Sequence, residues 1–541
     1  MISFNYTIKN IIMCDAKNIR DGINHRRRYR CPICYQNTLW IRRNRGICER
    51  CNEIPEKLMY EVKSSDWEGY YTTADIDIKF QENKRTEIGS VCGNIKSSMY
   101  TKGQIEKMKL IVKKSARIND LLDDCTIYFF KKHPYKDTKD RMLEDYDYLF
   151  NIVEDIHVIM NWISKDFTLM DLAYQMALYD DERNLMFSPA YYYFNLAQHF
   201  YESIERFYIC IGLMFKIQFQ KNAKDNTRYY IEKMLKKNDS YRNSELKKKF
   251  QEIKSQKGYE ELKRYREESS HNQSANLTKV ITQRVNVNQD RFFVDKQMIQ
   301  ENLADVLKVI NTEFELLEEV IKHLISYIDI TLDSNAIAII KSTGQINHLA
   351  ISELVDISVI LKNEYKRNEK RLFYINRRDG IIIGDIVFRL FEIIKGCNYA
   401  LFFETNIKYE FMKYDLEIVT DMMDKQYLIY LSAVRTISSY DKIAHFLIEK
   451  YLPEYTGKEI YFNDFLRDQP INHKIMKTCQ MIQRNPFYQF LDNYRNEITH
   501  IIRKGAIYTN VMEKYEGYLL VAICYNLEYL GDLLDSILDI R

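Results

Sequence analysis

The residues with the clearest chemical potential lie in a short pattern that occurs twice in the chain. Residues 265–271 read YREESSH and residues 494–500 read YRNEITH, so both copies fit Tyr-Arg-x-Glu-x-Ser/Thr-His. Histidine accounts for only 10 of the 541 residues, so chance recurrence of the whole pattern is improbable. An imidazole that titrates near neutral pH can act as a general base or acid, and an arginine that stays charged can clamp a phosphate.

RNA is a phosphodiester that these groups can cleave without a metal ion, because its 2′-OH supplies the nucleophile. Cleavage needs a base for the 2′-OH proton, an acid for the leaving 5′-oxygen and cations that stabilise the phosphorane. His271 and His500 are the expected acid–base groups, and Arg266 and Arg495 are the expected phosphate ligands. One Arg–His pair is half of such a site, so two pairs that face one another are expected to act together. The products would carry a 2′,3′-cyclic phosphate and a 5′-hydroxyl.

The sequence around the two copies also agrees, which indicates a duplicated domain. YESIERF from Tyr201 resembles YDKIAHF from Tyr440, upstream of each motif. A long amphipathic helix expected near 294–324 parallels another near 511–538, downstream of each motif. The order helix, helix, motif, helix therefore occurs twice. Helices of this length with few breakers are expected to bury one face against each other as bundles.

These motifs carry a resemblance to a known family. RNEITH at 495–500 resembles the Arg-Asn-x-x-x-His signature of HEPN domains, and REESSH at 266–271 resembles a divergent copy. The resemblance implies helical bundles that pair with both motifs in one cleft, and a metal-independent endoribonuclease. Asn496 follows Arg495 as the family pattern prefers, so it is expected to support the second motif. Members of this family include toxins and antiviral defence proteins, so the resemblance suggests a toxin or defence role.

Two features leave the activity of the motifs open. Positions five apart lie about 140° apart on a regular helix, so Arg266 and His271 converge only if the arginine reaches across or the helix breaks. Glu267 stands where the second copy has asparagine, and a carboxylate beside a phosphate site is unfavourable unless it points away. Glu268 and Glu497 precede their histidines by three positions and either orient the imidazole or form ordinary surface pairs.

A cysteine pattern near the N-terminus predicts a metal site. Cys31, Cys34, Cys48 and Cys51 form C-x2-C-x13-C-x2-C, which suits a structural zinc ion. Four thiolates leave no open position, so this zinc is expected to be structural and no metal is expected for catalysis. A thiol redox pair is the alternative for the first Cys-x-x-Cys.

Arginines surround the cysteines and predict nucleic-acid binding by this zinc ribbon. The alternative is a solvated basic knob that docks on an acidic patch of the same protein. A second basic segment, residues 221–266, carries 15 Lys or Arg against 7 acids and leads into the first motif, so it is a candidate RNA track. The arginines expected to contact nucleic acid at the ribbon are Arg26, Arg27, Arg28, Arg42, Arg43 and Arg45.

Composition agrees with a mainly α fold. The chain has only 16 Gly and 7 Pro, and its formal net charge is +3, so any basic surface must be local. No secretory signal and no apolar run of ~20 residues is visible, which makes a cytoplasmic, non-membrane protein the expectation.

The expected organisation is a zinc ribbon (1–58), a mixed connector (59–145), a first HEPN-like bundle (146–330), a helical connector (331–383) and a second HEPN-like bundle (384–541). The two bundles are expected to form an intramolecular pseudo-dimer.

The leading prediction is an RNA endonuclease, a hydrolase that binds RNA through its basic segments. The competing class is a non-catalytic nucleic-acid-binding or regulatory scaffold with degenerate bundles. A third class is a metal-dependent nuclease centred on Asp77, Glu82 and Lys84, which EDTA would stop. The oligomeric state stays open.

Overall fold

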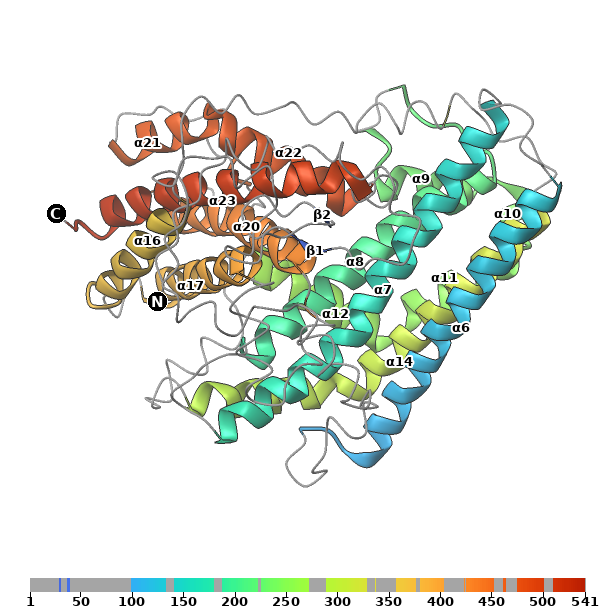
Figure 1. Cartoon of the computed structure of the whole chain (residues 1–541), viewed down its shortest axis with the longest axis horizontal. Helices are drawn as coiled ribbons and strands as arrows, with labels where there is room; N and C mark the ends of the chain where they lie inside the picture. The colour runs from blue at the N-terminus through green and yellow to red at the C-terminus, as the bar shows by residue number, and fades with distance from the viewer. Residues whose placement is uncertain are drawn as a thin grey trace.

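The structure, a computed structural model, is mainly helical, as the composition predicts (Figure 1). It describes residues 29–30, 37–38, 99–132, 141–179, 187–221, 225–271, 289–327, 336, 357–375, 380–402, 423, 425–451, 461–463, 474–500 and 509–540. Within these ranges the helices fall into two groups by order along the chain.

The first helical group comprises α6 (Lys102–Lys132), α7 (Arg141–Tyr179), α8 (Pro189–Met214), α9 (Arg228–Leu235), α10 (Asp239–Arg242), α11 (Glu245–Ser255), α12 (Lys257–His271) and α14 (Gln289–Tyr327). The second helical group comprises α16 (Ile357–Leu372), α17 (Gly380–Phe402), α20 (Lys425–Tyr451), α21 (Lys474–Gln483), α22 (Pro486–His500) and α23 (Thr509–Ile537). The long helices expected after each motif are α14 and α23, so these two predictions are confirmed.

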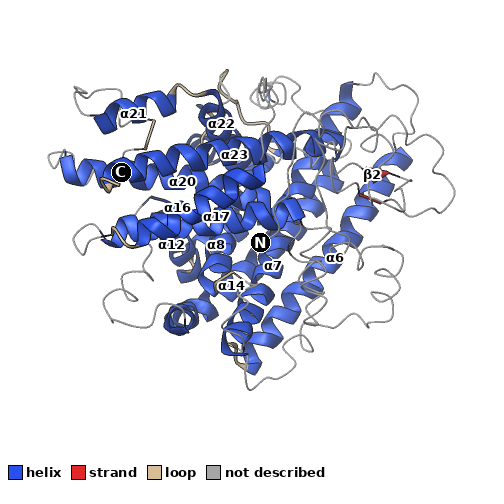
Figure 2. Cartoon of the chain, turned by 60° about the vertical axis from the view of Figure 1, so that its left-hand side comes forward, coloured by secondary structure: helices blue, strands red, loops and turns tan. Residues whose placement is uncertain are grey.

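The packing within the two groups follows one pattern. In the first group α8 packs against α7, α12 and α14, and in the second α20 packs against α17, α22 and α23. The helix that opens each group behaves alike too, because α6 packs on α7 and α14 while α16 packs on α17 and α23. Both of these opening helices lie in segments expected to be connectors. The groups lie side by side in both views (Figures 1 and 2).

Polar caps define where the helices around the basic segment begin. Ser188 accepts a hydrogen bond from the backbone N–H of Tyr191, and Pro189 occupies the first position of α8, where it costs no internal hydrogen bond. Thr227 caps α9 and Ser244 caps α11 in the same way. These local signals divide the segment between α8 and α12 into three short helices.

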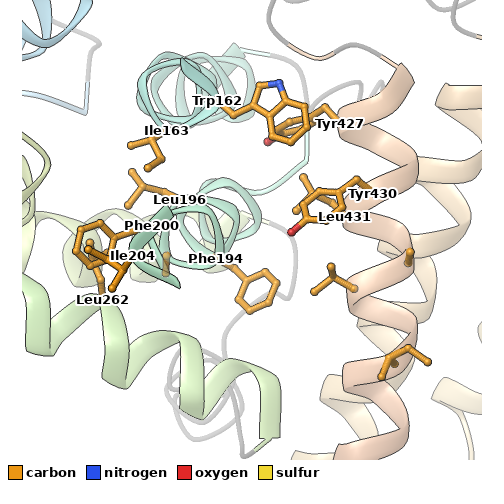
Figure 3. Close-up of a cluster of buried hydrophobic side chains, with 14 of the residues drawn as sticks. Trp162, Ile163, Phe194, Leu196, Phe200, Ile204, Leu262, Tyr427, Tyr430 and Leu431 are labelled. Atoms are coloured by element: carbon orange, nitrogen blue, oxygen red, sulfur yellow. The ribbon is translucent and has the colours of Figure 1, made fainter. Parts of the chain in front are cut away.

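One continuous apolar core joins the two groups. Figure 3 shows Trp162 of α7, Phe200 of α8 and Leu262 of α12 in the same cluster as Tyr430 and Leu431 of α20. Burial of such side chains contributes about 1.5–3 kcal/mol each, so separation of the groups would expose a large apolar surface. The two groups therefore form a single packed body.

Candidate functional site

The two motifs lie at the C-terminal ends of equivalent helices. α12 ends at His271 and α22 ends at His500, and the side chains of both histidines lie outside the described residues. Upstream, the matching residues of both copies are buried at the same offsets. They are Tyr259, Leu262 and Tyr265 in α12 and Tyr488, Leu491 and Tyr494 in α22.

Each motif helix also packs against helices of both groups. α12 packs against α8 and α14 of its own group and against α20 of the second. α22 packs against α20 and α23 of its own group and against α8 of the first. Each motif helix therefore contacts α8 of the first group and α20 of the second group.

A close backbone approach fixes the start of α12. A Cβ on Gly258 would lie 2.2 Å from the carbonyl oxygen of Asp305 in α14, so only glycine allows this contact. At the other end, Arg389 of α17 donates a hydrogen bond to the carbonyl of Ser269. Both ends of the first motif helix are thus held, one by its own group and the other by the second group.

Arg266 lies against Gln198 and Tyr201 of α8. Its Nε donates to Oε1 of Gln198 at 3.3 Å, and its guanidinium lies 4.3 Å from the ring centroid of Tyr201. Gln198 in turn donates to Glu202 at 2.6 Å, and the hydroxyl of Tyr430 from the second group donates to the same carboxylate oxygen. Burial raises the pKa of Glu202. A hydrogen-bonded chain therefore links the second group to the first motif arginine.

Arg495 has a more acidic environment than Arg266. Its Nη2 lies 3.2 Å from Oδ1 of Asp492, and its side chain is 15% exposed. Burial alone would lower the pKa of Arg495, but the carboxylates of Asp441 and Asp492 outweigh burial and raise it. Asn496 is exposed, and its amide nitrogen lies 3.5 Å from Oδ2 of Asp492, which is a weak contact.

The sequence explains why the two motif arginines have different surroundings. Asp492 lies two residues before Tyr494, and the equivalent position of the first copy is Lys263. The first motif therefore lacks the carboxylate that engages Arg495. By contrast, Glu202 and Asp441 occupy equivalent positions of the YESIERF and YDKIAHF segments, so their shared acidity could have identified them as site residues.

The glutamates next to the first motif histidine differ in their surroundings. Glu268 accepts a hydrogen bond from Arg264 at 3.0 Å, four residues earlier on the same helix. Its relation to His271, three residues later, stays a prediction because the His271 side chain lies outside the described residues. Glu267 is half-buried.

A buried polar network connects the groups behind the motifs. Nδ1 of His199 lies 3.0 Å from Asp166, and the hydroxyl of Tyr427 donates to the same carboxylate at 2.5 Å. Asn195 donates to the Tyr427 oxygen at 2.6 Å and accepts from Arg435 at 2.7 Å. His199 therefore contributes to the packing of α7, α8 and α20. The network holds α7, α8 and α20 in one register.

The predicted zinc ligands and ribbon arginines lie outside the described residues, as do Asp77, Glu82 and Lys84. Two short strands that flank the first cysteine pair are described. β1 (Tyr29–Arg30) pairs antiparallel with β2 (Asn37–Thr38), and Cys31 and Cys34 fall between them in sequence. Among the described residues there is no cluster of three His, Cys, Asp or Glu side chains that could hold a metal.

No known protein family, curated protein or solved structure matches this chain. None of the described helices is long and apolar enough to cross a membrane. A functional conclusion must therefore come from the motifs and from the geometry around them.

Proposed function

We propose that this protein is a metal-independent endoribonuclease in which two HEPN-like bundles form an intramolecular pseudo-dimer. The observation that carries the proposal is the reciprocal packing of the motif helices. α12 and α22 each contact both α8 and α20, so neither motif belongs to one group alone. Two Arg–His pairs drawn from both groups supply the two acid–base groups and two cations that 2′-OH attack requires.

In this proposal the side chains have separate tasks. His271 and His500 exchange protons with the 2′-OH and the leaving 5′-oxygen, while Arg266 and Arg495 bind the phosphate. Arg266 faces an amide and a ring, whereas Arg495 is paired with Asp492 and is also influenced by the charge of Asp441. A phosphate must compete with those carboxylates at the second motif. This comparison favours Arg266 as the stronger phosphate ligand, despite the neighbouring Glu267.

The N-terminal segment is proposed to be a zinc ribbon that positions nucleic acid. Support comes from the antiparallel pairing of β1 with β2, which brings together the two ends of the segment that carries the first cysteine pair. Cys31, Cys34, Cys48 and Cys51 would hold one structural Zn²⁺. The surrounding arginines would bind phosphates.

The environment of Arg495 also supports a second candidate function, a nucleic-acid-binding or regulatory scaffold without cleavage. An arginine matched by Asp441 and Asp492 has a complete structural role, since its charge is already compensated. In a scaffold the motifs would stabilise the junction of the two groups.

One experiment separates these candidates. Wild type and the His271→Ala/His500→Ala variant are incubated with mixed single-stranded and structured RNA in EDTA, followed by end-group analysis. Cyclic-phosphate ends from wild type alone support the endoribonuclease. RNA binding without cleavage by either protein supports the scaffold. Asp77→Ala serves as the control for metal-dependent chemistry, because EDTA can also remove structural zinc.

A further inference from the structure

A second arginine from the basic segment lies at the first motif. Arg228, the first residue of α9, places its guanidinium 5.6 Å from the ring centroid of Tyr201. Arg266 lies 4.3 Å from the same centroid, so the two guanidinium groups are within about 10 Å of each other. The ring thus joins the motif to a segment almost 40 residues upstream.

The local charge around Tyr201 is not balanced. Glu205 lies 3.6 Å from Arg228 and is its ion-pair partner. Glu202, which accepts a hydrogen bond from the Gln198 that Arg266 contacts, is buried, and its raised pKa disfavours the charged form. Burial and Glu205 raise the pKa of Tyr201 to about 12, while both arginines oppose this rise. Two guanidinium groups therefore act on the Tyr201 ring together with the carboxylate of Glu205, and a phosphate would be attracted to both arginines.

The basic surface continues along α9. Tyr229 and Lys233 lie one turn apart on α9, and Lys236 and Lys237 follow directly after its last residue, Leu235. The tyrosine and the three lysines are exposed, and the Tyr229 side chain is 80% exposed. An exposed aromatic ring interleaved with lysines is the combination that binds single-stranded nucleic acid by stacking and phosphate contacts.

We infer that Arg228, Tyr201 and Arg266 form a phosphodiester-binding subsite, and that a single-stranded RNA runs from it along the exposed face of α9. This inference rests on the proposed function, because it names the path by which the substrate strand reaches the first motif. Arg228 binds the phosphate next to the one held by Arg266. Tyr229 stacks on a base, and Lys233 and Lys237 contact later phosphates.

The test measures binding in the His271→Ala/His500→Ala background, so that cleavage does not interfere. The probe is a fluorescein-labelled single-stranded 20-nucleotide RNA, followed by anisotropy from 50 to 200 mM salt. Each lost phosphate contact on a single strand reduces the slope of log affinity against log salt by about 0.7. We expect this reduction for Arg228→Ala, with binding weakened about tenfold. Lys233→Ala/Lys237→Ala should reduce the slope by about 1.4.

The chain offers matched controls. Arg117 is an exposed arginine of α6, and Lys362 and Lys366 are exposed lysines of α16 with the same four-residue spacing as Lys233 and Lys237. Alanine variants of these controls should keep the wild-type slope. Arg228→Lys should keep the slope but lose part of the affinity, because a lysine cannot bind bidentately. Thermal unfolding checks that every variant folds.

The outcomes are decisive for this subsite. Slopes for Arg228→Ala and Lys233→Ala/Lys237→Ala equal to those of the controls would overturn it. Equal competition by a poly-glutamate 20-mer would also overturn it, since the surface would then bind any polyanion. Arg228-dependent binding in a protein that never cleaves RNA would refute the endoribonuclease and leave the subsite standing. Cleavage by a protein whose RNA binding does not depend on Arg228 would support the endoribonuclease and overturn the subsite.

Discussion

Tyr430→Phe tests whether the second group orients the first motif arginine. Phenylalanine keeps the ring contacts to Trp162 and His199, at centroid distances of 5.9 Å and 6.0 Å, and removes only the hydroxyl that donates to Glu202. Glu202 is fully buried, so water cannot replace the lost donor. Removing a hydrogen-bond partner from a buried polar group costs about 1–3 kcal/mol, so we expect the unfolding free energy to fall by ~2 kcal/mol.

The assay is urea unfolding combined with RNA binding. Tyr374→Phe is the matched control, because Tyr374 is 48% exposed and the loss of its hydroxyl should change stability by less than about 0.5 kcal/mol. A double-mutant cycle of Tyr430→Phe with Glu202→Gln should show a coupling of at least ~1 kcal/mol. Tyr430→Phe should also weaken RNA binding, and should have no further effect when Arg266 is already alanine.

Two results would refute this reasoning. Additive stability effects in the cycle would show that the Tyr430 hydroxyl does not stabilise the Glu202 carboxylate. Equal weakening of RNA binding by Tyr430→Phe with and without Arg266 would show that the effect does not pass through that arginine.

Three further predictions concern stability and metal content. Gly258→Ala should lower the unfolding free energy by about 1–3 kcal/mol, since the new Cβ would lie 2.2 Å from the backbone carbonyl oxygen of Asp305. An unchanged urea midpoint would contradict this. Burial alone would raise the pKa of Glu232, but two lysine ammonium groups outweigh it and lower the pKa to about 2. The ion pairs of Glu232 should therefore stabilise the fold by about 2 kcal/mol after solvent screening above pH ~4.5, and this stabilisation should be lost as pH falls towards 2. Glu232→Gln should flatten that part of the curve of unfolding free energy against pH. Cys31→Ser and Cys48→Ser should lower bound zinc, measured by elemental analysis, whereas zinc-free wild type would exclude the ribbon.

Local sequence patterns were sufficient for the helices and for the duplication. The helices expected near 294–324 and 511–538 are α14 and α23, because apolar periodicity and the scarcity of breakers act over a few turns of chain. Tyr259, Leu262 and Tyr265 have the same spacing as Tyr488, Leu491 and Tyr494, and the structure buries all six. Capping residues such as Ser188 and Thr227 define helix starts for the same local reason.

The surroundings of the motif arginines could be predicted only in part. Asp492 is one helical turn before Arg495, so its contact follows from sequence spacing. The contact of Arg266 with Gln198 joins residues that are 68 positions apart, and no periodicity encodes it. The acidic positions Glu202 and Asp441 carried a signal, because they align in the two repeats.

What only the tertiary structure decided is how the two groups complete one another. The Tyr430–Glu202 hydrogen bond joins residues 228 positions apart, and the Arg389–Ser269 hydrogen bond joins residues 120 positions apart. Such contacts depend on how whole helices cross, and crossing is set by the fit of many side chains in the shared core. The sequence by itself determined that two similar helical repeats each carry one motif. Tertiary packing decided that each motif helix contacts both repeats and that Arg228 and Arg266 both lie against the ring of Tyr201.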